Sequence, residues 1–470
     1  MLQYLEELKE KLQNRESTAD LHTHTHCSDG AKSVSSLVKI AKDSGLSFLA
    51  ITDHNTPGYI RGVSSLVTGY SAKSSDIFVD VDGLVVIPGV EITNRCYYAK
   101  NRPGYNAEYK RNWTDVYEKF HMVVLGADRN PRFDFNKLMA LKHKSDIISD
   151  YGVFGFCNKE FNTEFSLPDV KKIIQKEKFK NPNFQYFKPA EVARIVEKRL
   201  IELGRPVEKR TILGALNSHE GKIVCSGYQN RLNLDSADVI TTAKCAGGTT
   251  IWAHPHFEVK KEARRAALGE LIRQGLDGVE VYYSRFIGHQ TSFTDYMDDG
   301  HEHPELNLLW SGGSDFHTEI HAKNRVGKAW NKDIVAQDLT VIDALIEKQA
   351  ERTTALLRGE DLPYHDTYLS KKIVDKYSHI YDVKCQPIED LIKFDEIDYL
   401  NSQLNNPSSQ QVVENESASF DEKPEDEFVV DDRFIEELEA EEVASKKGKN
   451  SYWKDVLKSL EIKDDVMGDE

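Results

Sequence analysis

A histidine-rich stretch near the start of the chain reads Asp20-Leu21-His22-Thr23-His24-Thr25-His26-Cys27-Ser28-Asp29-Gly30. Alternate residues of a strand project on the same face, so His22 and His24 can reach one point in space. Imidazole is the commonest metal ligand in proteins. The turn-forming residues around Asp29 would return its carboxylate towards the same point. The pattern predicts a metal clamp, although a polar strand end with chance histidines would give the same short motif.

Length, charge and cysteine usage narrow the class of protein. The 470 residues allow two or three domains, and a formal net charge of −16 argues against a protein that tracks nucleic acid over its whole surface. Any contact with phosphate must therefore come from a local site. Six cysteines without a Cys-x-x-Cys pair indicate reduced thiols in the cytoplasm. We expect no signal peptide and no membrane span, because long apolar runs are missing.

Strand and helix patterns alternate on both sides of a helical segment. Apolar strands are predicted at 47–52, 83–89, 121–126, 249–253 and 278–283. This rhythm favours a parallel sheet flanked by helices. The predicted parts of the chain are an N-terminal helix (1–16), a sheet domain (17–130 and 236–345), a helical insertion (131–235), a helical extension (346–400) and an acidic, largely disordered tail (401–470).

Candidate metal ligands recur where the predicted strands end. They are His22, His24, Asp29, His54, Glu91, His121, His254, Asp315 and His317. The carboxyl ends of strands form the active face of a parallel barrel, so these side chains should meet there. Nine ligands suit two or three ions that share a bridging carboxylate. Imidazole with carboxylate favours manganese, zinc or iron over calcium or magnesium, and a pocket with several such ions would attract phosphate.

These segments resemble the PHP family, named for polymerase and histidinol phosphatase. The matching motifs are Asp-Leu-His22-Thr-His24 with Ser-Asp29-Gly, Ile-Thr-Asp53-His54, Pro-Gly-Val-Glu91, His121-Met-Val-Val-Leu-Gly, Ala-His254-Pro and Gly-Gly-Ser-Asp315-Phe-His317. The resemblance implies an α/β fold, a distorted (β/α)7 barrel with three metal ions, and phosphoester hydrolysis by metal-activated hydroxide. The helical insertion resembles the branch that acts on nucleotides and short RNA.

The resemblance also implies how the ligands are shared among the ions. The first ion would be held by His22, His24, Glu91 and Asp315. Glu91 would bridge to the second ion, with His121 and His254. The third ion would be held by Asp29, His54 and His317. Glu91, Asp315 and His254 are the expected catalytic residues. Glu91 and His121 are thirty positions apart, which is wider than the resemblance to this branch implies, and the acidic C-terminal region beyond about residue 340 has no counterpart in the family.

Residues beyond the ligands are candidates for substrate binding. Arg129 and Arg285 follow predicted strands, and each could bind a phosphate through two parallel hydrogen bonds. His256 lies two positions after the candidate ligand His254. Surface exposure explains such arginines equally simply. Between residues 95 and 118, basic and aromatic residues alternate and could follow phosphates and stack on bases. A hairpin whose tyrosines cover the barrel rim would explain the same pattern.

The expected function is a metal-dependent phosphoesterase acting on nucleotides, nucleoside bisphosphates or short RNA. A phosphatase of a small metabolite such as histidinol phosphate is the alternative among enzymes. The alternative from another class is a non-catalytic metal-binding scaffold. In that case the acidic tail would recruit a protein partner, since its composition argues against a packed core.

Overall fold

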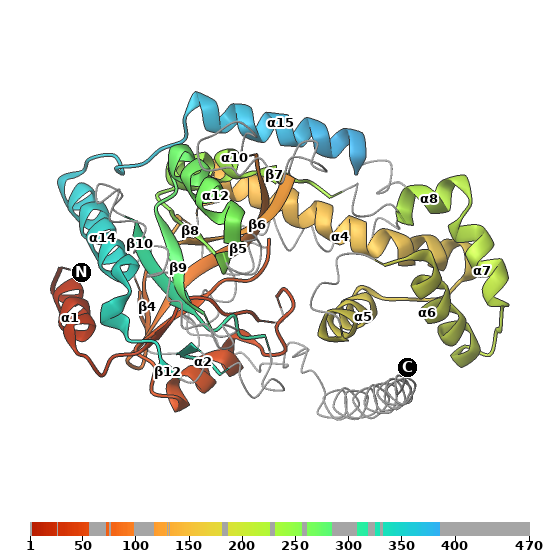
Figure 1. Ribbon diagram of the computed structural model, residues 1–470, viewed down its shortest axis with the longest axis horizontal. Coiled ribbons are helices and arrows are strands. Elements are labelled where there is room, and N and C mark those ends of the chain that lie inside the picture. Colours follow the sequence, from red (N-terminus) through yellow and green to blue (C-terminus); the bar gives the residue numbers. More distant parts are fainter. Residues whose placement is uncertain are drawn as a thin grey trace, which may run out of the picture.

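The computed structural model describes residues 2–25, 27–55, 72–74, 77–97, 117–128, 130, 132–180, 187–225, 231–255, 261–283, 308–317, 325–329 and 332–385. Within these residues the chain forms a mixed α/β barrel from which a group of helices projects (Figure 1). The tail predicted at 401–470 lies outside the described residues. No helix in the described part is long and apolar enough to cross a membrane.

The central sheet curls into a nearly closed barrel. Its main path through the described residues is β1 (Ala19–Asp20), β2 (Phe48–Ile51), β5 (Leu84–Tyr97), β6 (Tyr117–Leu125), β8 (Thr249–Trp252), β9 (Gly278–Tyr283) and β10 (Leu309–Gly313). The ends of this path meet, because the backbone N–H of Leu21 donates to the carbonyl of Gly312 at 3.0 Å and that of Asp315 to the carbonyl of His22 at 2.8 Å. The predicted distorted (β/α)7 barrel is therefore confirmed.

Three short strands add to the sheet beside β5, and two more form a separate hairpin. Antiparallel β3 (Ala72–Ser74) and β4 (Val79–Val81) add to one side of β5, and β7 (Leu234–Asp235) pairs parallel with its far end. A separate hairpin consists of β11 (Lys328–Ala329) and β12 (Lys332–Asp333). These additions leave the barrel path intact.

The expectation of a wholly parallel sheet is wrong at β6. The pairs β1–β2, β2–β5, β8–β9 and β9–β10 are parallel, but β6 runs antiparallel to both β5 and β8. The reason is the length of β5, which continues past Glu91 and pairs with β6 from Gly89↔Leu125 to Tyr97↔Tyr117 as one long hairpin. The reversal has a consequence for the site. His121 precedes its apolar run, and only an antiparallel strand brings it to the face that the other candidate ligands share.

Helices cover the outside of the barrel. Helix α2 (Val34–Asp43) begins at Ser33, whose hydroxyl accepts the backbone N–H of Ser36 at 3.1 Å, as a helix N-cap does. Helices α10 (Ser236–Cys245) and α12 (Lys261–Gln274) follow later in the chain. On another side of the barrel, α1 (Leu2–Gln13) and α14 (Thr340–Arg358) share one apolar core with the strands. The 3-10 turn η3 (Ala336–Asp338) directly precedes α14.

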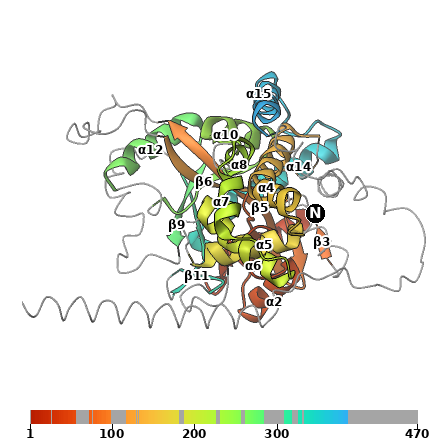
Figure 2. The same ribbon diagram turned by 90° about the vertical axis from the view of Figure 1, so that its right-hand side faces the viewer.

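A helical lobe occupies the segment predicted as an insertion. The long helix α4 (Asp134–Phe161) leads out of the barrel. At its far end lie α5 (Leu167–Lys180), α6 (Pro189–Glu202), α7 (Lys209–Leu216) and α8 (His219–Cys225) (Figures 1 and 2). Buried side chains of this lobe belong to the same core cluster as one face of the barrel, among them Phe154 on α4, Phe165 between α4 and α5, and Val192 on α6. The domain boundaries stay a prediction.

The last described helix, α15 (Tyr368–Lys384), lies along α4 and α10 (Figure 1). Its buried Tyr377 accepts the backbone N–H of Asp235 at 2.8 Å and donates to the carboxylate of Asp238 at 2.9 Å. Ser370 donates to Asp134, at the start of α4, at 2.8 Å. This helix therefore fastens the base of the lobe to the barrel.

Candidate metal centre

The centre begins with the two histidines that follow β1. Thr23, between them, forms a parallel bridge with Phe316, so His22 and His24 project on the same side as alternate residues do. Both are buried, and their ring centroids lie 5.2 Å apart. The strand-like spacing of the sequence thus brings the two rings together, as expected.

Glu91 stands at the middle of the cluster and is completely buried. Its Oε2 lies 3.3 Å from Nε2 of His22, 3.3 Å from Nε2 of His24 and 2.9 Å from Nδ1 of His54. Its Oε1 lies 2.9 Å from Nε2 of His254 and 3.5 Å from Nδ1 of His121. Each oxygen of one carboxylate therefore faces a different set of imidazoles.

Asp315, which follows β10, completes the most buried group of candidate ligands. Its Oδ1 lies 3.1 Å from Nε2 of His24 and 3.7 Å from Nε2 of His22, while the hydroxyl of Tyr283 donates to Oδ2 at 2.7 Å. With Glu91, these residues present four candidate ligand atoms within 4.8 Å of one another, all from buried side chains. A single cation could contact all four.

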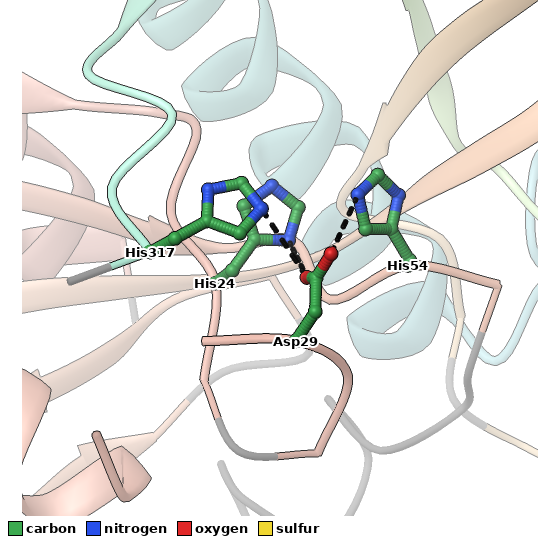
Figure 3. A group of neighbouring side chains, drawn as sticks. All are labelled: His24, Asp29, His54 and His317. Atoms are coloured by element: carbon green, nitrogen blue, oxygen red, sulfur yellow. Dashed lines mark ion pairs between the residues drawn. The ribbon is translucent and has the colours of Figure 1, made fainter. Parts of the chain in front are cut away.

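A second group surrounds Asp29, nearer the surface (Figure 3). Its carboxylate lies between three rings, 3.7 Å from Nδ1 of His24, 3.6 Å from Nε2 of His54 and 3.2 Å from Nε2 of His317. The turn that carries Asp29 is held by Asp53, which accepts the hydroxyl of Ser28 at 2.6 Å. The turn predicted from the sequence thus returns the carboxylate to the histidines.

The structure brings all nine predicted ligand residues into one connected cluster. Three overlapping groups arise, namely His22, His24, Glu91 and Asp315; His24, Asp29, His54 and His317; and His54, Glu91 and His121. His254 joins them through its contact with Glu91. The assignment of these residues to individual ions stays a prediction.

Buried polar atoms test whether the donor set fits a cation. Within the described residues, Nε2 of His22, both ring nitrogens of His24 and Oε2 of Glu91 are buried without a hydrogen bond. Leaving such atoms unsatisfied is costly, and native structures rarely do so. A cation at the shared point would satisfy Nε2 of His22, Nε2 of His24 and Oε2 of Glu91 together, whereas Nδ1 of His24 faces Asp29 at 3.7 Å. Imidazoles with carboxylates are the donors that manganese, zinc and iron accept, so the residues fit such ions.

The pKa shifts show that the cluster favours positive charge. Burial lowers the pKa of His24, but the nearby Asp315 and Glu91 more than offset this and raise it to about 10. The pKa of His22 is likewise raised well above its usual value, since Glu280 and Glu91 outweigh burial. For His54, burial prevails and lowers the pKa to about 4. The carboxylates thus stabilise positive charge where His22 and His24 meet.

Two candidate ligands have strained backbones. His254 has φ of 27° and Asp315 has φ of 50°, values in the left-handed region that residues with a side chain rarely adopt. Such a conformation costs on the order of 1–3 kcal/mol, and it persists where the surroundings hold it. Strain of this kind concentrates at functional sites, and here it falls on two residues that face Glu91 or its neighbours.

One buried acid of the site was missed in the sequence. Glu280, 2% exposed on β9, lies 3.0 Å from Nδ1 of His22. Its signal was a single charge within the otherwise apolar strand 278–283. Asp20 and Asp53, which lie close to candidate ligands in the sequence, accept hydrogen bonds from residues at the strand ends. Asp20 accepts the backbone N–H and the hydroxyl of Ser314, and Asp53 those of Thr25.

The residues predicted to bind substrate cannot be placed. Arg129, Arg285 and His256 lie outside the described residues, as do 98–116, the larger part of the basic and aromatic segment. The structure shows only that this segment connects two paired strands, because β5 ends at Tyr97 and β6 begins at Tyr117. Their roles in binding substrate stay predictions.

Comparison with known proteins gives one family match. Residues 20–181 match the model of the PHP domain. Among curated proteins, none is similar enough to count as a relative. Similar solved structures include an amidohydrolase from Chromobacterium violaceum with bound sulfate and no metal (18% identity, TM-score 0.39, covering 70% of this chain and 97% of that chain).

Two further solved structures are similar to this chain, the first to about the same degree and the second less so. One is a protein of Bifidobacterium adolescentis assigned as a metal-dependent phosphoesterase (19% identity, TM-score 0.39, covering 70% of this chain and 96% of that chain). The other is Endonuclease Q in complex with a 27-mer duplex that carries an abasic lesion (12% identity, TM-score 0.28, covering 64% of this chain and 49% of that chain). These likenesses are too weak to assign an activity.

Proposed function

We propose that this protein is a metal-dependent phosphoesterase, a hydrolase of phosphoester bonds, because residues 20–181 match the PHP domain. The proposed substrates are phosphate esters of nucleotides, nucleoside bisphosphates or short RNA. The observation that carries the proposal is the position of Glu91, whose two oxygens face two different sets of imidazoles. A carboxylate placed in this way can bridge two ions.

The proposed centre holds three ions of manganese, zinc or iron. The first is assigned to His22, His24, Glu91 and Asp315. The second is assigned to Glu91, His121 and His254. The third is assigned to Asp29, His54 and His317. Close-packed imidazole and carboxylate groups in each set support this assignment.

Bound divalent ions would activate water and neutralise charge on a transferring phosphoryl group. The chain itself positions the carboxylates, since Glu91 is buried and Asp315 accepts a hydrogen bond from the hydroxyl of Tyr283. Glu91, Asp315 and His254 are the proposed catalytic residues. His254 is buried, and its Nε2 lies 2.9 Å from Glu91, where it would help to hold the second ion beside that carboxylate.

The distribution of charge supports a nucleic-acid substrate over a small metabolite. Residues 131–235, which include the helical lobe, contain 19 Lys and Arg against 13 Asp and Glu, whereas the whole chain contains 61 against 77. Several of these basic residues, such as Lys198, Lys209 and Arg210, are exposed. A local surplus of positive charge attracts a phosphate backbone. Arg129, Arg285, His256 and residues 98–116 are proposed to add further contacts to substrate.

A substrate panel tests this proposal. Manganese-loaded protein would be given a mononucleotide, a nucleoside bisphosphate, a short RNA and histidinol phosphate at low and high salt. We expect the nucleotide esters to be preferred and the KM for RNA to rise with salt, because counterions compete for the phosphates. The Asp315→Asn variant, which removes one ligand charge, should be inactive on all of them. Preference for histidinol phosphate without salt dependence would support the alternative phosphatase.

Metal analysis separates the enzyme from a scaffold. Elemental analysis of protein purified without chelator should find more than one ion per chain. Bound ions without hydrolysis of any ester would favour a non-catalytic scaffold whose acidic tail recruits a protein partner. A single ion or none after reconstitution would contradict the proposed centre. The proposal includes a cytoplasmic location, which the scattered cysteines of the sequence support.

A further inference from the structure

Glu280 is a buried acid beside the proposed centre that belongs to none of its three ligand groups. It lies on β9, between β8, which leads to His254, and β10, which leads to Asp315. An ionised carboxylate is expensive to bury unless its oxygens accept hydrogen bonds. The groups that contact the Glu280 carboxylate therefore indicate which parts of the site it positions.

The two oxygens of Glu280 serve two different candidate ligands. Oε1 lies 3.0 Å from Nδ1 of His22, and Oε2 accepts the backbone N–H of His254 at 2.7 Å. The opposite ring nitrogen of His22, Nε2, faces Glu91 at 3.3 Å and Asp315 at 3.7 Å. One carboxylate thus contacts a ligand proposed for the first ion and a ligand proposed for the second.

The contact with His22 determines where that ring carries its hydrogen. An ionised carboxylate can only accept, so Nδ1 of a neutral His22 must be the donor. The lone pair of the ring then lies on Nε2, on the side of Glu91 and Asp315. Metal-binding histidines commonly have their second nitrogen fixed by a carboxylate in this way, and the contact makes the ring a better ligand.

The contact with His254 fixes a strained backbone. At φ of 27°, His254 has a conformation that would relax if nothing held it. The hydrogen bond from its backbone N–H to Oε2 of Glu280 is short, at 2.7 Å, and buried. In this conformation the ring of His254 reaches Oε1 of Glu91.

We infer that Glu280 is a positioning residue that couples two ligand sets of the proposed metal centre. It holds His22 in the tautomer that presents Nε2, and it holds His254 in the backbone conformation that presents its ring. The inference rests on the proposed centre but not on the identity of the substrate.

Glu280→Gln is the sharpest test, because the amide keeps the shape and loses one acceptor. Glutamine offers one oxygen and one NH₂ group, so it can accept from His22 or from the backbone of His254 but not from both. The matched control is Glu270→Gln. Glu270 is also buried, but its carboxylate contacts Arg273 and Gln274 on α12 and no candidate ligand in the described residues.

Zinc affinity, measured by competition with a chelating dye, is the main readout. We expect Glu280→Gln to bind at least one ion about 10- to 100-fold more weakly than wild type, which is the usual effect of removing a carboxylate that hydrogen-bonds to a metal ligand. The absorption spectrum of the cobalt-loaded protein should change as well, since it reports ligand geometry independently of activity. Glu270→Gln should match wild type in both measurements.

Two outcomes would overturn different parts of this reasoning. Equal zinc affinity and equal cobalt spectra for Glu280→Gln and wild type would refute the role of Glu280 and leave the proposed centre standing. Wild-type protein that binds no ions would refute the centre itself. Should Glu280→Gln fail to fold, Glu280→Asp provides the test, because it keeps the charge but is too short to reach both partners. It should fold and still bind zinc more weakly, and unchanged affinity would again refute the role.

Discussion

Filling the metal centre should expel protons, and the structure sets their number. Without metal, the carboxylates keep the pKa of His22 well above its usual value and that of His24 at about 10, while burial holds the pKa of His54 at about 4. At pH 7, His22 and His24 therefore carry an extra proton and His54 does not. A ligand must offer a lone pair, so metal binding should release about two protons per chain, one from each ring.

Calorimetry can count these protons. Chelator-stripped protein would be titrated with Mn²⁺ at pH 7 in buffers of different ionisation enthalpy, whose heats reveal the protons released. The sign of the pH dependence follows from the raised pKa values. The pKa of His24 is about 10 and that of His22 is also raised, so each ring should lose a proton on binding, and the affinity should rise with pH by up to about tenfold per pH unit for each proton displaced.

A count near zero would refute this reasoning, because the two rings would then be neutral despite the carboxylates around them. An affinity that falls as pH rises would refute it too. The matched control is His365→Gln, which replaces an exposed histidine outside the cluster. The proton count of this variant should equal that of wild type.

Three other changes test separate parts of the structure. Glu91→Gln should lower phosphoester hydrolysis by at least about 10²- to 10³-fold, as loss of a charge-stabilising group does, with an unchanged circular dichroism spectrum; near wild-type rates would show that the bridge is not needed. Tyr377→Phe should lower the free energy of unfolding in urea by about 1–3 kcal/mol, because the partly buried N–H of Asp235 loses its acceptor, and no loss would mean that water replaces it. Truncation after residue 400 should leave hydrolysis and the unfolding midpoint unchanged, and a fall in either would show that the tail packs on the barrel.

Much of the candidate site could be predicted because its signals are local. His22 and His24 are two positions apart, and a strand places such residues on one face wherever it pairs. His54, Glu91 and Asp315 each follow an apolar run, and the carboxyl ends of parallel strands meet at one edge. These rules hold without knowledge of the rest of the fold.

What could not be predicted depends on pairing between distant segments. The apolar run at 121–126 does not encode its direction, which is set when β6 pairs with the long strand β5. Glu280 belongs to no sequence motif that would reveal its role. That role depends on the position of β9 between the strands that lead to His254 and Asp315. The hydrogen bonds that Ser314 donates to Asp20 likewise join segments that lie far apart in the sequence.

The closure of the barrel between β1 and β10 has a consequence for how the protein is made. The first histidines of the centre leave the ribosome early, but their partners across the seam, Asp315 and Phe316, are synthesised last among the barrel segments. A nascent chain that stops before β10 exposes the edge of β1 and lacks one acid of the deepest ligand group. Because chains fold from the N-terminus during synthesis, this centre can acquire its full set of ligands only after nearly the whole barrel has been translated.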